Sequence, residues 1–377
     1  MERIRNLMPQ DLTSQALSFD PVLPWEGQEE AVTRREDGSI HLRIKAPLAK
    51  RVAFVIGEKE YDCVRDGQGV WGLRFPYRFG FHFVQLVIDG AEVLTPLLPI
   101  GYGYSRPYNF VSLEREGEDF YRLKEVPHGS VRREYYYSAV TDTWESCLVY
   151  TPPEYEEEAE REYPVLYLQH GHGENEVGWI TAGRVNFIMD NLLAEHRAVP
   201  FLIVMNNGMV QTENPQGKRM VDYQLFGSRL IRDVIPFIEQ RFRVKKDKIN
   251  RAMAGLSMGS IQTCLTGFCH PDYFAWLGVF SGFMHDFIQG SELDMVQREN
   301  STNEHLALLE DKERFHREFR LLFRAIGEED PFLNHFYQDD ALCRDKGIRH
   351  IRKTYGGGHD WNVWRYCIYD FAQYLFR

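Results

Sequence analysis

A serine flanked on each side by a glycine two residues away is the strongest sign of a catalytic group in this sequence. Gly255-Leu256-Ser257-Met258-Gly259 is a G-x-S-x-G sequence that follows a short apolar stretch, 250–254, and precedes a stretch typical of a helix start, 260–265. A strand, a sharp turn and a helix are the context in which this motif forms a nucleophile elbow. Residues two before and two after the serine crowd together there, and glycines have no side chain to collide. The motif predicts Ser257 as a nucleophile, with the N–H of Met258 as one oxyanion donor.

A histidine that could activate this serine lies near the end of the chain. A serine hydroxyl becomes nucleophilic when a histidine takes its proton and an acid orients that histidine. His359 follows a predicted strand, 350–355, and a run of three glycines, and it precedes a predicted helix. A histidine on a glycine loop at the carboxyl end of a strand can reach across to a serine on another strand. We therefore interpret His359 as the base.

The acid is expected on the loop after the preceding predicted strand, 321–326. Asp330 lies on that loop just before Pro331, whose ring restricts the residue before it to an extended conformation. We predict Asp330 as the acid. Glu328 and Glu329 are expected to face water, although either could replace Asp330 geometrically. The resulting order of serine, acid and histidine is the one found in α/β-hydrolases.

Loops at the ends of other predicted strands supply the remaining candidates. The sequence His170-Gly171-His172-Gly173 follows the apolar run 164–168, and the second oxyanion N–H is expected from Gly171 or His172. Aromatic side chains near the strand ends are candidates for a pocket wall, with core packing as an equal alternative for each. The candidates for substrate contact are Trp179, Asn207, Phe283, Phe332 and Trp361.

Other histidines and the six cysteines have structural interpretations. His305 and His316 lie in a polar helical stretch and are expected to face solvent. The cysteines form no C-x-x-C pair, and their spacing matches no zinc module. Cys264 and Cys269 fall on the helix after Ser257, where buried thiols are common. We expect core thiols, no metal and no organic cofactor.

Continuous apolar runs in the second part of the chain predict the sheet that would carry these residues. Runs of this kind are buried on both faces, as in parallel sheets. They fall at 164–168, 201–205, 276–280 and 321–326. Helical stretches alternate with them, at 225–242, 261–269, 303–315, 333–346 and 361–376. This alternation predicts a doubly wound α/β sheet with its ligand site beyond the carboxyl ends of the strands.

The first part of the chain has a different period. Apolar and polar residues alternate at 41–46, 52–56 and 81–88, and Asp89-Gly90 is a strong hairpin signal. Several short strands at this spacing predict a small all-β sandwich. We therefore expect a lead-in segment at 1–25, a sandwich domain at 26–120 and an α/β domain at 121–377.

Charge and hydropathy exclude several classes of partner. The net charge of −11 argues against nucleic acid or an anionic membrane, since either would need a basic face. No apolar run approaches the ~20 residues of a membrane span. The N-terminus has no apolar signal-peptide core. A cytoplasmic protein is expected, or a secreted one if a leader has been removed.

Several segments together resemble a known esterase family. The stretch 126–377 is similar to the family that includes feruloyl and acetylxylan esterases of carbohydrate esterase family 1, and esterase D. The resemblance rests on segments 126–131, 163–171, 251–259 and 357–364. It implies an α/β-hydrolase fold, Ser257 as nucleophile, His359 as base and the Asp330 region as acid. The front part is similar to the immunoglobulin-like, early-set sandwich that precedes such esterases, although Thr95-Pro96 stands where an Asp-Pro is often found. In the elbow of the esterase stretch, Ser260 stands where a glycine is frequent.

These expectations converge on a serine esterase acting through an acyl-serine on small carboxylic esters, such as feruloyl, cinnamoyl or acetyl esters of carbohydrates. Within enzymes, a trilactone siderophore esterase and an acyltransferase are the alternatives. The non-enzyme alternative is a catalytically silent protein whose sandwich binds a glycan. The small ester is the expected partner, and a homo-oligomer is an open possibility.

Overall fold

The computed structural model describes residues 31–213, 216–285 and 303–377. The chain divides into two compact units, Met1–Asp119 and Phe120–Arg377.

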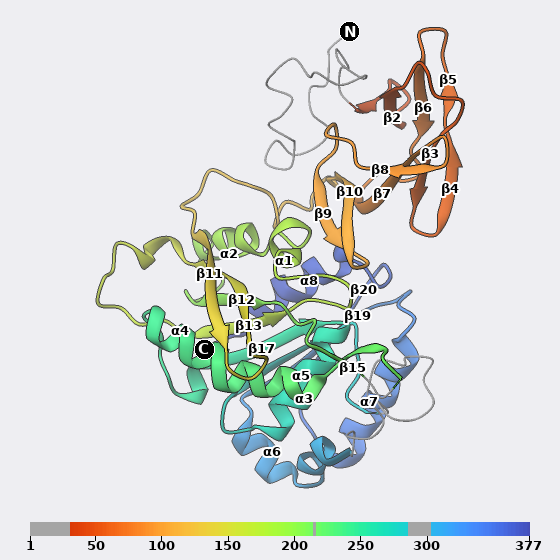
Figure 1. The fold of residues 1–377 in the computed structure, drawn as a ribbon. Helices are drawn as coiled ribbons and strands as arrows, with labels where there is room; N and C mark the ends of the chain where they lie inside the picture. The colour runs from red at the N-terminus through yellow and green to blue at the C-terminus, as the bar shows by residue number, and fades with distance from the viewer. Residues whose placement is uncertain (1–30, 214–215, 286–302) are drawn as a thin grey trace. The chain divides into compact units, whose positions relative to one another are not determined.

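In its described residues, 31–119, the first unit is built from antiparallel strands in two sheets (Figure 1). One sheet has the order β1-β2-β6-β5 and the other β4-β3-β7-β10-β9, with β8 paired to β7. The strands are β1 (Val32–Arg34), β2 (Ile40–Lys45), β3 (Val52–Ile56), β4 (Lys59–Asp62), β5 (Val64–Arg65), β6 (Val70–Arg74), β7 (Gly80–Ile88), β8 (Ala91–Val93), β9 (Ile100–Gly103) and β10 (Arg106–Leu113). Inward side chains of both sheets, such as Leu42, Phe54 and Leu86, share one core. The alternating pattern therefore builds a sandwich.

The second unit is organised by one sheet with the order β11-β12-β14-β13-β17-β18-β19-β20. Its strands are β11 (Ser130–Ser138), β12 (Thr143–Thr151), β13 (Val165–Gln169), β14 (Leu202–Asn206), β17 (Arg251–Leu256), β18 (Trp276–Phe280), β19 (Leu321–Gly327) and β20 (Ile351–Tyr355). The β11–β12 hairpin joins β14 antiparallel, and the pairs from β14 to β20 are parallel. A small ribbon, β15 (Gln211–Glu213) and β16 (Arg219–Val221), pairs separately. Every residue of β13, β14, β17 and β18 is buried, as their continuous apolar runs predict.

Helices cover both faces of this sheet. In Figure 1, α1, α2 and α8 lie on one side of it and α3, α4 and α5 on the other. The α-helices are α1 (Gly178–Thr181), α2 (Val185–Ala194), α3 (Tyr223–Arg229), α4 (Ile235–Arg241), α5 (Met258–Cys269), α6 (Lys312–Glu318), α7 (Leu333–Lys346) and α8 (Trp361–Ala372). The 3₁₀ helices are η3 (Pro153–Tyr155), η5 (Lys248–Asn250) and η6 (Asn303–Glu310), and η4 (Leu230–Val234) is a π-helix. Every helix within the described residues is too short or too polar to span a lipid bilayer.

Some elements differ from the sequence-based expectations. The helix expected over 225–242 is α3 and α4 joined by a π-helical turn, η4. The helix expected over 303–315 is instead the 3₁₀ segment η6 followed by α6. Helix α2 was not predicted, although its Val185, Ile188, Met189 and Leu192 have helical spacing and are buried.

Two side chains lie opposite to expectation. His305, expected to face solvent, is 2% exposed, and its ring Nε2–H donates to the carbonyl oxygen of Met284 at 2.9 Å. Cys269, expected in the core, is exposed. It is the last residue of α5, so it lies beyond the turns that pack on the sheet. The other five cysteines are buried.

Candidate active site

Ser257 stands at a strained turn between β17 and α5. Its φ of 51° and ψ of −118° lie in a region that a non-glycine residue adopts only when its surroundings hold it there. An added Cβ on Gly255 would lie 2.5 Å from the carbonyl carbon of Gly259, and one on Gly259 would lie 2.7 Å from the carbonyl oxygen of His170. Both flanking glycines are therefore required. The N–H of Ser257 donates to the carbonyl oxygen of Phe280 at 2.9 Å. The turn is thus fixed to β18.

Ser260, which departs from the family pattern, has a defined place in the elbow. It is fully buried, and its hydroxyl donates to the carbonyl oxygen of Ser257 at 2.5 Å. The facing residue is Gly282, where an added Cβ would lie 1.7 Å from the Ser260 hydroxyl oxygen. The serine therefore fits because residue 282 has no side chain.

His359 and Asp330 come together at the carboxyl ends of β20 and β19. Nδ1 of His359 lies 2.8 Å from Oδ2 of Asp330, an arrangement in which Nδ1–H donates and Nε2 is left as the proton acceptor. The Asp330 carboxylate is fully buried, whereas the His359 side chain is 24% exposed. The second Asp330 oxygen accepts the N–H of Phe332 at 2.9 Å. Glu328 and Glu329 are exposed, which agrees with the expectation that they face water.

The loops that carry this pair are locked to each other. An added Cβ on Gly327 would lie 2.4 Å from the carbonyl oxygen of Gly357. The N–H of Glu329 donates to that same oxygen at 2.9 Å. Close backbone approach therefore fixes the position of the acid relative to the histidine. Among the described residues, the Ser257 hydroxyl makes no hydrogen bond to His359, and such catalytic bonds often tighten only with substrate present.

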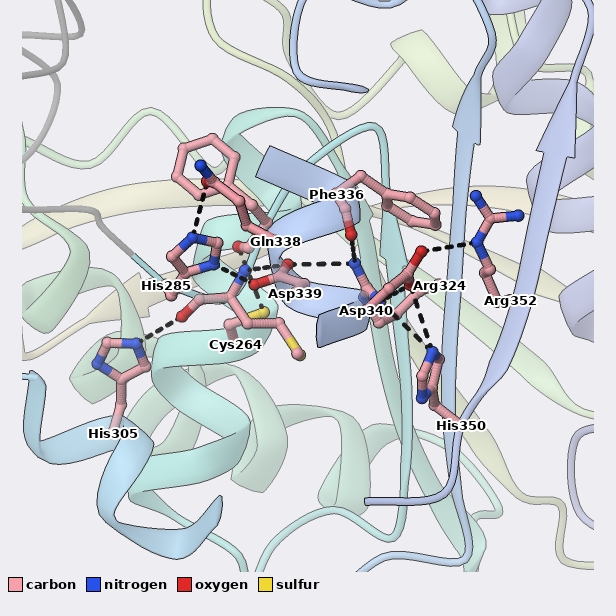
Figure 2. A network of polar contacts seen from close by, with 12 residues as sticks. Cys264, His285, His305, Arg324, Phe336, Gln338, Asp339, Asp340, His350 and Arg352 are labelled. Carbon is pink, nitrogen blue, oxygen red and sulfur yellow. Dashed lines mark hydrogen bonds and ion pairs between the residues drawn. The ribbon is translucent and has the colours of Figure 1, made fainter. Parts of the chain in front are cut away.

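A buried ion-pair network holds the helix that follows Asp330 (Figure 2). Arg324 on β19 is wholly buried and contacts three groups of α7: Asp340 at 2.6 Å, the Phe336 carbonyl oxygen at 2.8 Å and Asp339 at 3.2 Å. Asp339 also accepts the N–H of Met284 at 2.8 Å and contacts the ring of His285. The network joins β19, α7 and the segment after β18.

The loop after β13 approaches Ser257. An added Cβ on Gly171 would lie 3.5 Å from Cβ of Ser257. The N–H of Gly171, however, donates to Oε2 of Glu174 at 3.0 Å, so this expected oxyanion donor is already engaged. In the described part of the chain, the N–H of His172 has no such partner and remains the candidate in this loop. Met258 is the first residue of α5, where N–H groups lack partners within the helix.

Glu174 was not predicted from the sequence. Its carboxylate is buried, and Oε1 accepts the indole N–H of Trp361 at 2.9 Å. Burial raises the pKa of Glu174 to about 7, against hydrogen bonds from Gly171 and Trp361 that lower it. One carboxylate thus joins the loop after β13 to the start of α8, two residues after His359.

His170 fixes the other side of this loop. It is buried, with Nδ1 2.8 Å from the carbonyl oxygen of Gly171, and its Nε2 accepts the N–H of Gly208 at 2.8 Å. Burial lowers its pKa to about 4, so the ring is neutral and connects the loops after β13 and β14. Asn207, a candidate for substrate contact, is half-buried, and its Oδ1 accepts the N–H of Met209 at 2.9 Å.

The four aromatic candidates divide into one partly exposed residue and three buried ones. Phe332 is half-buried, and its ring meets the ring of His359 edge-on at 5.2 Å. Phe283 is 2% exposed and packs 5.5 Å behind Phe332. Trp179 and Trp361 are 0% and 2% exposed and pack on each other at 5.1 Å. The two tryptophans therefore support the loops from the core, and Phe332 is the aromatic candidate with exposed surface.

No group of three or more histidine, cysteine, aspartate or glutamate side chains comes together to hold a metal ion in the ranges that the structure describes.

The sheet, the elbow and the order of the strands define an α/β-hydrolase. The family model described as "Putative esterase" matches residues 138–372, and the chain belongs to this esterase family. A curated relative, the endo-1,4-beta-xylanase/feruloyl esterase of Xylanibacter ruminicola, is 35% identical over 265 residues, which cover 68% of this chain. The chain spans 36% of that relative's length.

Solved structures show the same fold. A ferulic acid esterase is 26% identical, with a TM-score of 0.57, and the match covers 66% of this chain and 97% of the other. The enterobactin esterase of Shigella flexneri is 13% identical, with a TM-score of 0.62, and the match covers 92% of this chain and 96% of the other. This second likeness shows the fold alone, and it extends over most of both units.

Proposed function

We propose that this protein is a serine esterase that hydrolyses carboxylic esters of carbohydrates, with feruloyl or acetyl groups as the acyl part. The observation that carries the proposal is the 2.8 Å contact between Asp330 and His359 in a fold that presents Ser257 on a strained elbow. Membership of the esterase family supports the reaction class. The xylanase/feruloyl esterase and ferulic acid esterase relatives support the substrate class.

The reaction divides into two steps. Nε2 of His359 takes the hydroxyl proton of Ser257 as its oxygen attacks the ester carbonyl, and Asp330 stabilises the imidazolium that forms. The oxyanion receives hydrogen bonds from the N–H groups of Met258 and His172, each worth about 10²–10³ in rate. The bond to the alcohol breaks, the alcohol leaves with the proton from His359, and an acyl-serine remains. Water then attacks the acyl-serine with the same base and releases the acid.

Phe332 is our candidate for contact with the acyl group. It is half-buried, and its ring packs against His359, so a planar cinnamoyl group bound at the reacting centre would lie within reach of it. Burial of Phe283 behind it gives this wall a fixed position.

A trilactone siderophore esterase is the second candidate. The observation that favours it is the enterobactin esterase likeness, which covers 92% of this chain, whereas the ferulic acid esterase covers 66%.

The test is a hydrolysis panel of methyl ferulate, acetylated xylo-oligosaccharides, 4-nitrophenyl acetate and a catecholate trilactone. We expect methyl ferulate or the acetylated oligosaccharide to give the highest kcat/KM, and Ser257→Ala to abolish it without changing the fold. Preference for the trilactone would select the second candidate. Retention of activity by Ser257→Ala would refute both.

A further inference from the structure

A basic cleft in the first unit lies outside the site described above. It has a volume of about 530 Å³ and lies on the face of the β1-β2-β6-β5 sheet that points away from the sandwich core. Four of its lining residues are arginines, Arg35, Arg43, Arg65 and Arg74, and Asp66 is the one acidic residue among those that line it. The cleft lies wholly within residues 33–74.

The strand period and register explain how the arginines share this face. On β2, Leu42 is buried in the core while its neighbours His41 and Arg43 point the other way. Across the ladder, His41 pairs with Arg74 of β6, and Arg43 pairs with Gly72. Successive side chains of a strand alternate between faces, so these positions come together on the outer surface.

Gly72 makes the hollow between them. It lies on β6 with Arg43 of β2 on one side and Val64 of β5 on the other. An added Cβ at Gly72 would meet only the carbonyl oxygen of Val64, at 3.9 Å. Any larger residue would therefore fill the floor of the cleft, which Val64 and Val70 line with apolar surface.

The positive charge of this cleft is only partly balanced, because Asp66 attracts Arg43 and Arg65, and Asp37 attracts Arg74, from beyond ion-pair distance. Among the described residues, Arg35, Arg43 and Arg74 form no ion pair, whereas other arginines of the same unit do: Arg51 pairs with Glu60 and Asp62, and Arg106 with Glu92. Arg65 donates to the carbonyl oxygen of Pro47 at 2.7 Å.

The pKa of His41 reflects its burial and the charge of these arginines. Burial, followed by repulsion from Arg35 and Arg74, lowers the pKa of His41, against the attraction of Asp37. Asp66 accepts the N–H groups of Val70 and Gln68, each at 2.9 Å, so its carboxylate is held by the turn. The cleft thus combines the guanidinium groups of Arg35, Arg43 and Arg74 with one carboxylate that already accepts two backbone hydrogen bonds. The guanidinium group of Arg65, at the edge of the cleft, is turned toward Pro47 and Trp71.

We infer that this cleft binds an anionic sugar whose acidic group, a carboxylate or a phosphate, contacts the arginines. The guanidinium group binds either anion through paired N–H donors. The volume lies in the range of small-molecule sites and exceeds what a bare inorganic anion would fill. The apolar floor of Val64 and Val70 suits the ring of the sugar. This inference does not depend on the esterase reaction proposed above.

The test is calorimetric titration of the full chain with four probes at low salt. The probes are a xylotriose bearing a glucuronic acid branch, glucose 6-phosphate, neutral xylotriose and inorganic phosphate. We expect one or both acidic sugars to bind, and the sugar that binds more tightly identifies the acidic group as a carboxylate or a phosphate. The affinity should fall as the salt concentration rises, because salt screens the charges. Equal binding of neutral xylotriose, equal binding of inorganic phosphate, or no binding of either acidic sugar would overturn the inference.

Matched variants locate the binding. The double variant Arg43→Gln, Arg74→Gln should bind the acidic sugar at least tenfold more weakly than the unchanged protein. The variant Arg43→Lys should lose less affinity, because it keeps the positive charge. Arg106→Gln, on β10 in the other sheet of this unit, should bind as the unchanged protein does. Thermal unfolding checks that each variant is folded. Unchanged affinity in the folded double variant would place the ligand elsewhere and refute the assignment.

Discussion

Glu174 and Trp361, which are 187 positions apart in the sequence, are joined by a 2.9 Å hydrogen bond from the indole N–H to the carboxylate. The other carboxylate oxygen accepts the N–H of Gly171. This buried acid therefore connects the loop beside Ser257 to the helix that begins after His359.

The first prediction concerns the effect of Glu174 on stability. Burial raises its pKa from 4.5 to about 7, so between these values the folded state binds a proton that the unfolded chain releases. The free energy of unfolding should therefore fall by roughly 3 kcal/mol as the pH rises from 4.5 to about 7, and it should level off above that. Glu174→Gln does not titrate and should lack this slope when the two proteins are compared by urea unfolding.

Glu176 is the matched control for Glu174. Burial raises its pKa, but its own N–H, Ser146 and Arg133 outweigh that effect and lower the pKa overall. Glu176 therefore stabilises the fold above its unfolded pKa of about 4.5, and that stability is lost as the pH falls through the lower folded value. Glu176→Gln should keep the slope between pH 4.5 and 7. Parallel curves for Glu174→Gln and the unchanged protein would contradict the first prediction.

The second prediction is that Asp330, and neither neighbouring glutamate, orients His359. Asp330→Asn should keep the fold and lower kcat by about 10⁴, the scale that neutralising the triad acid has in chymotrypsin-type enzymes. Glu328→Gln and Glu329→Gln should change kcat little, because both residues are exposed. Steady-state kinetics on the best ester of the panel measures all three. An inactive glutamate variant would disprove the assignment.

The third prediction tests the contact between Ser260 and Gly282. Gly282→Ala would bring a methyl group against the Ser260 hydroxyl, and overpacking of this kind costs about 1–3 kcal/mol. Ser260→Gly in the same chain removes the obstacle and should recover stability relative to Gly282→Ala alone. Urea unfolding of both single variants and the double variant gives the coupling energy. Strictly additive effects would show that the two residues do not limit each other.

The fourth prediction concerns the network around Arg324. Arg324→Met leaves the buried carboxylate of Asp339 without its cation, and breaking a buried pair in this way costs about 3–5 kcal/mol. Arg352 also binds Asp340, at 2.8 Å, but its side chain is 36% exposed, so Arg352→Met should cost less than about 1 kcal/mol. Chemical denaturation compares the two. Equal losses would mean that burial is not what makes Arg324 important.

Local sequence was sufficient for the features that depend on neighbours in the chain. The crowding of Gly255 against Gly259 occurs within one turn, so the motif predicts it directly. The buried strands are recognised because each carries its apolar residues in one continuous run, and α7 begins and ends where its pattern predicts. The pairing of Asp330 with His359 followed from the rule that the carboxyl ends of parallel strands meet at one edge of a sheet.

Only the tertiary structure decided features that depend on burial by distant segments. The polar surroundings of His305 predicted exposure, yet η6 places its ring against Met284. Trp179 fits a pocket wall by position, yet its ring is buried against Trp361. Glu174 stands in a polar stretch that suggests an ordinary solvated acid. Its raised pKa and its hold on Gly171 arise because Trp361 and the packed loops remove water from it, and desolvation by residues far along the chain leaves no local pattern in the sequence.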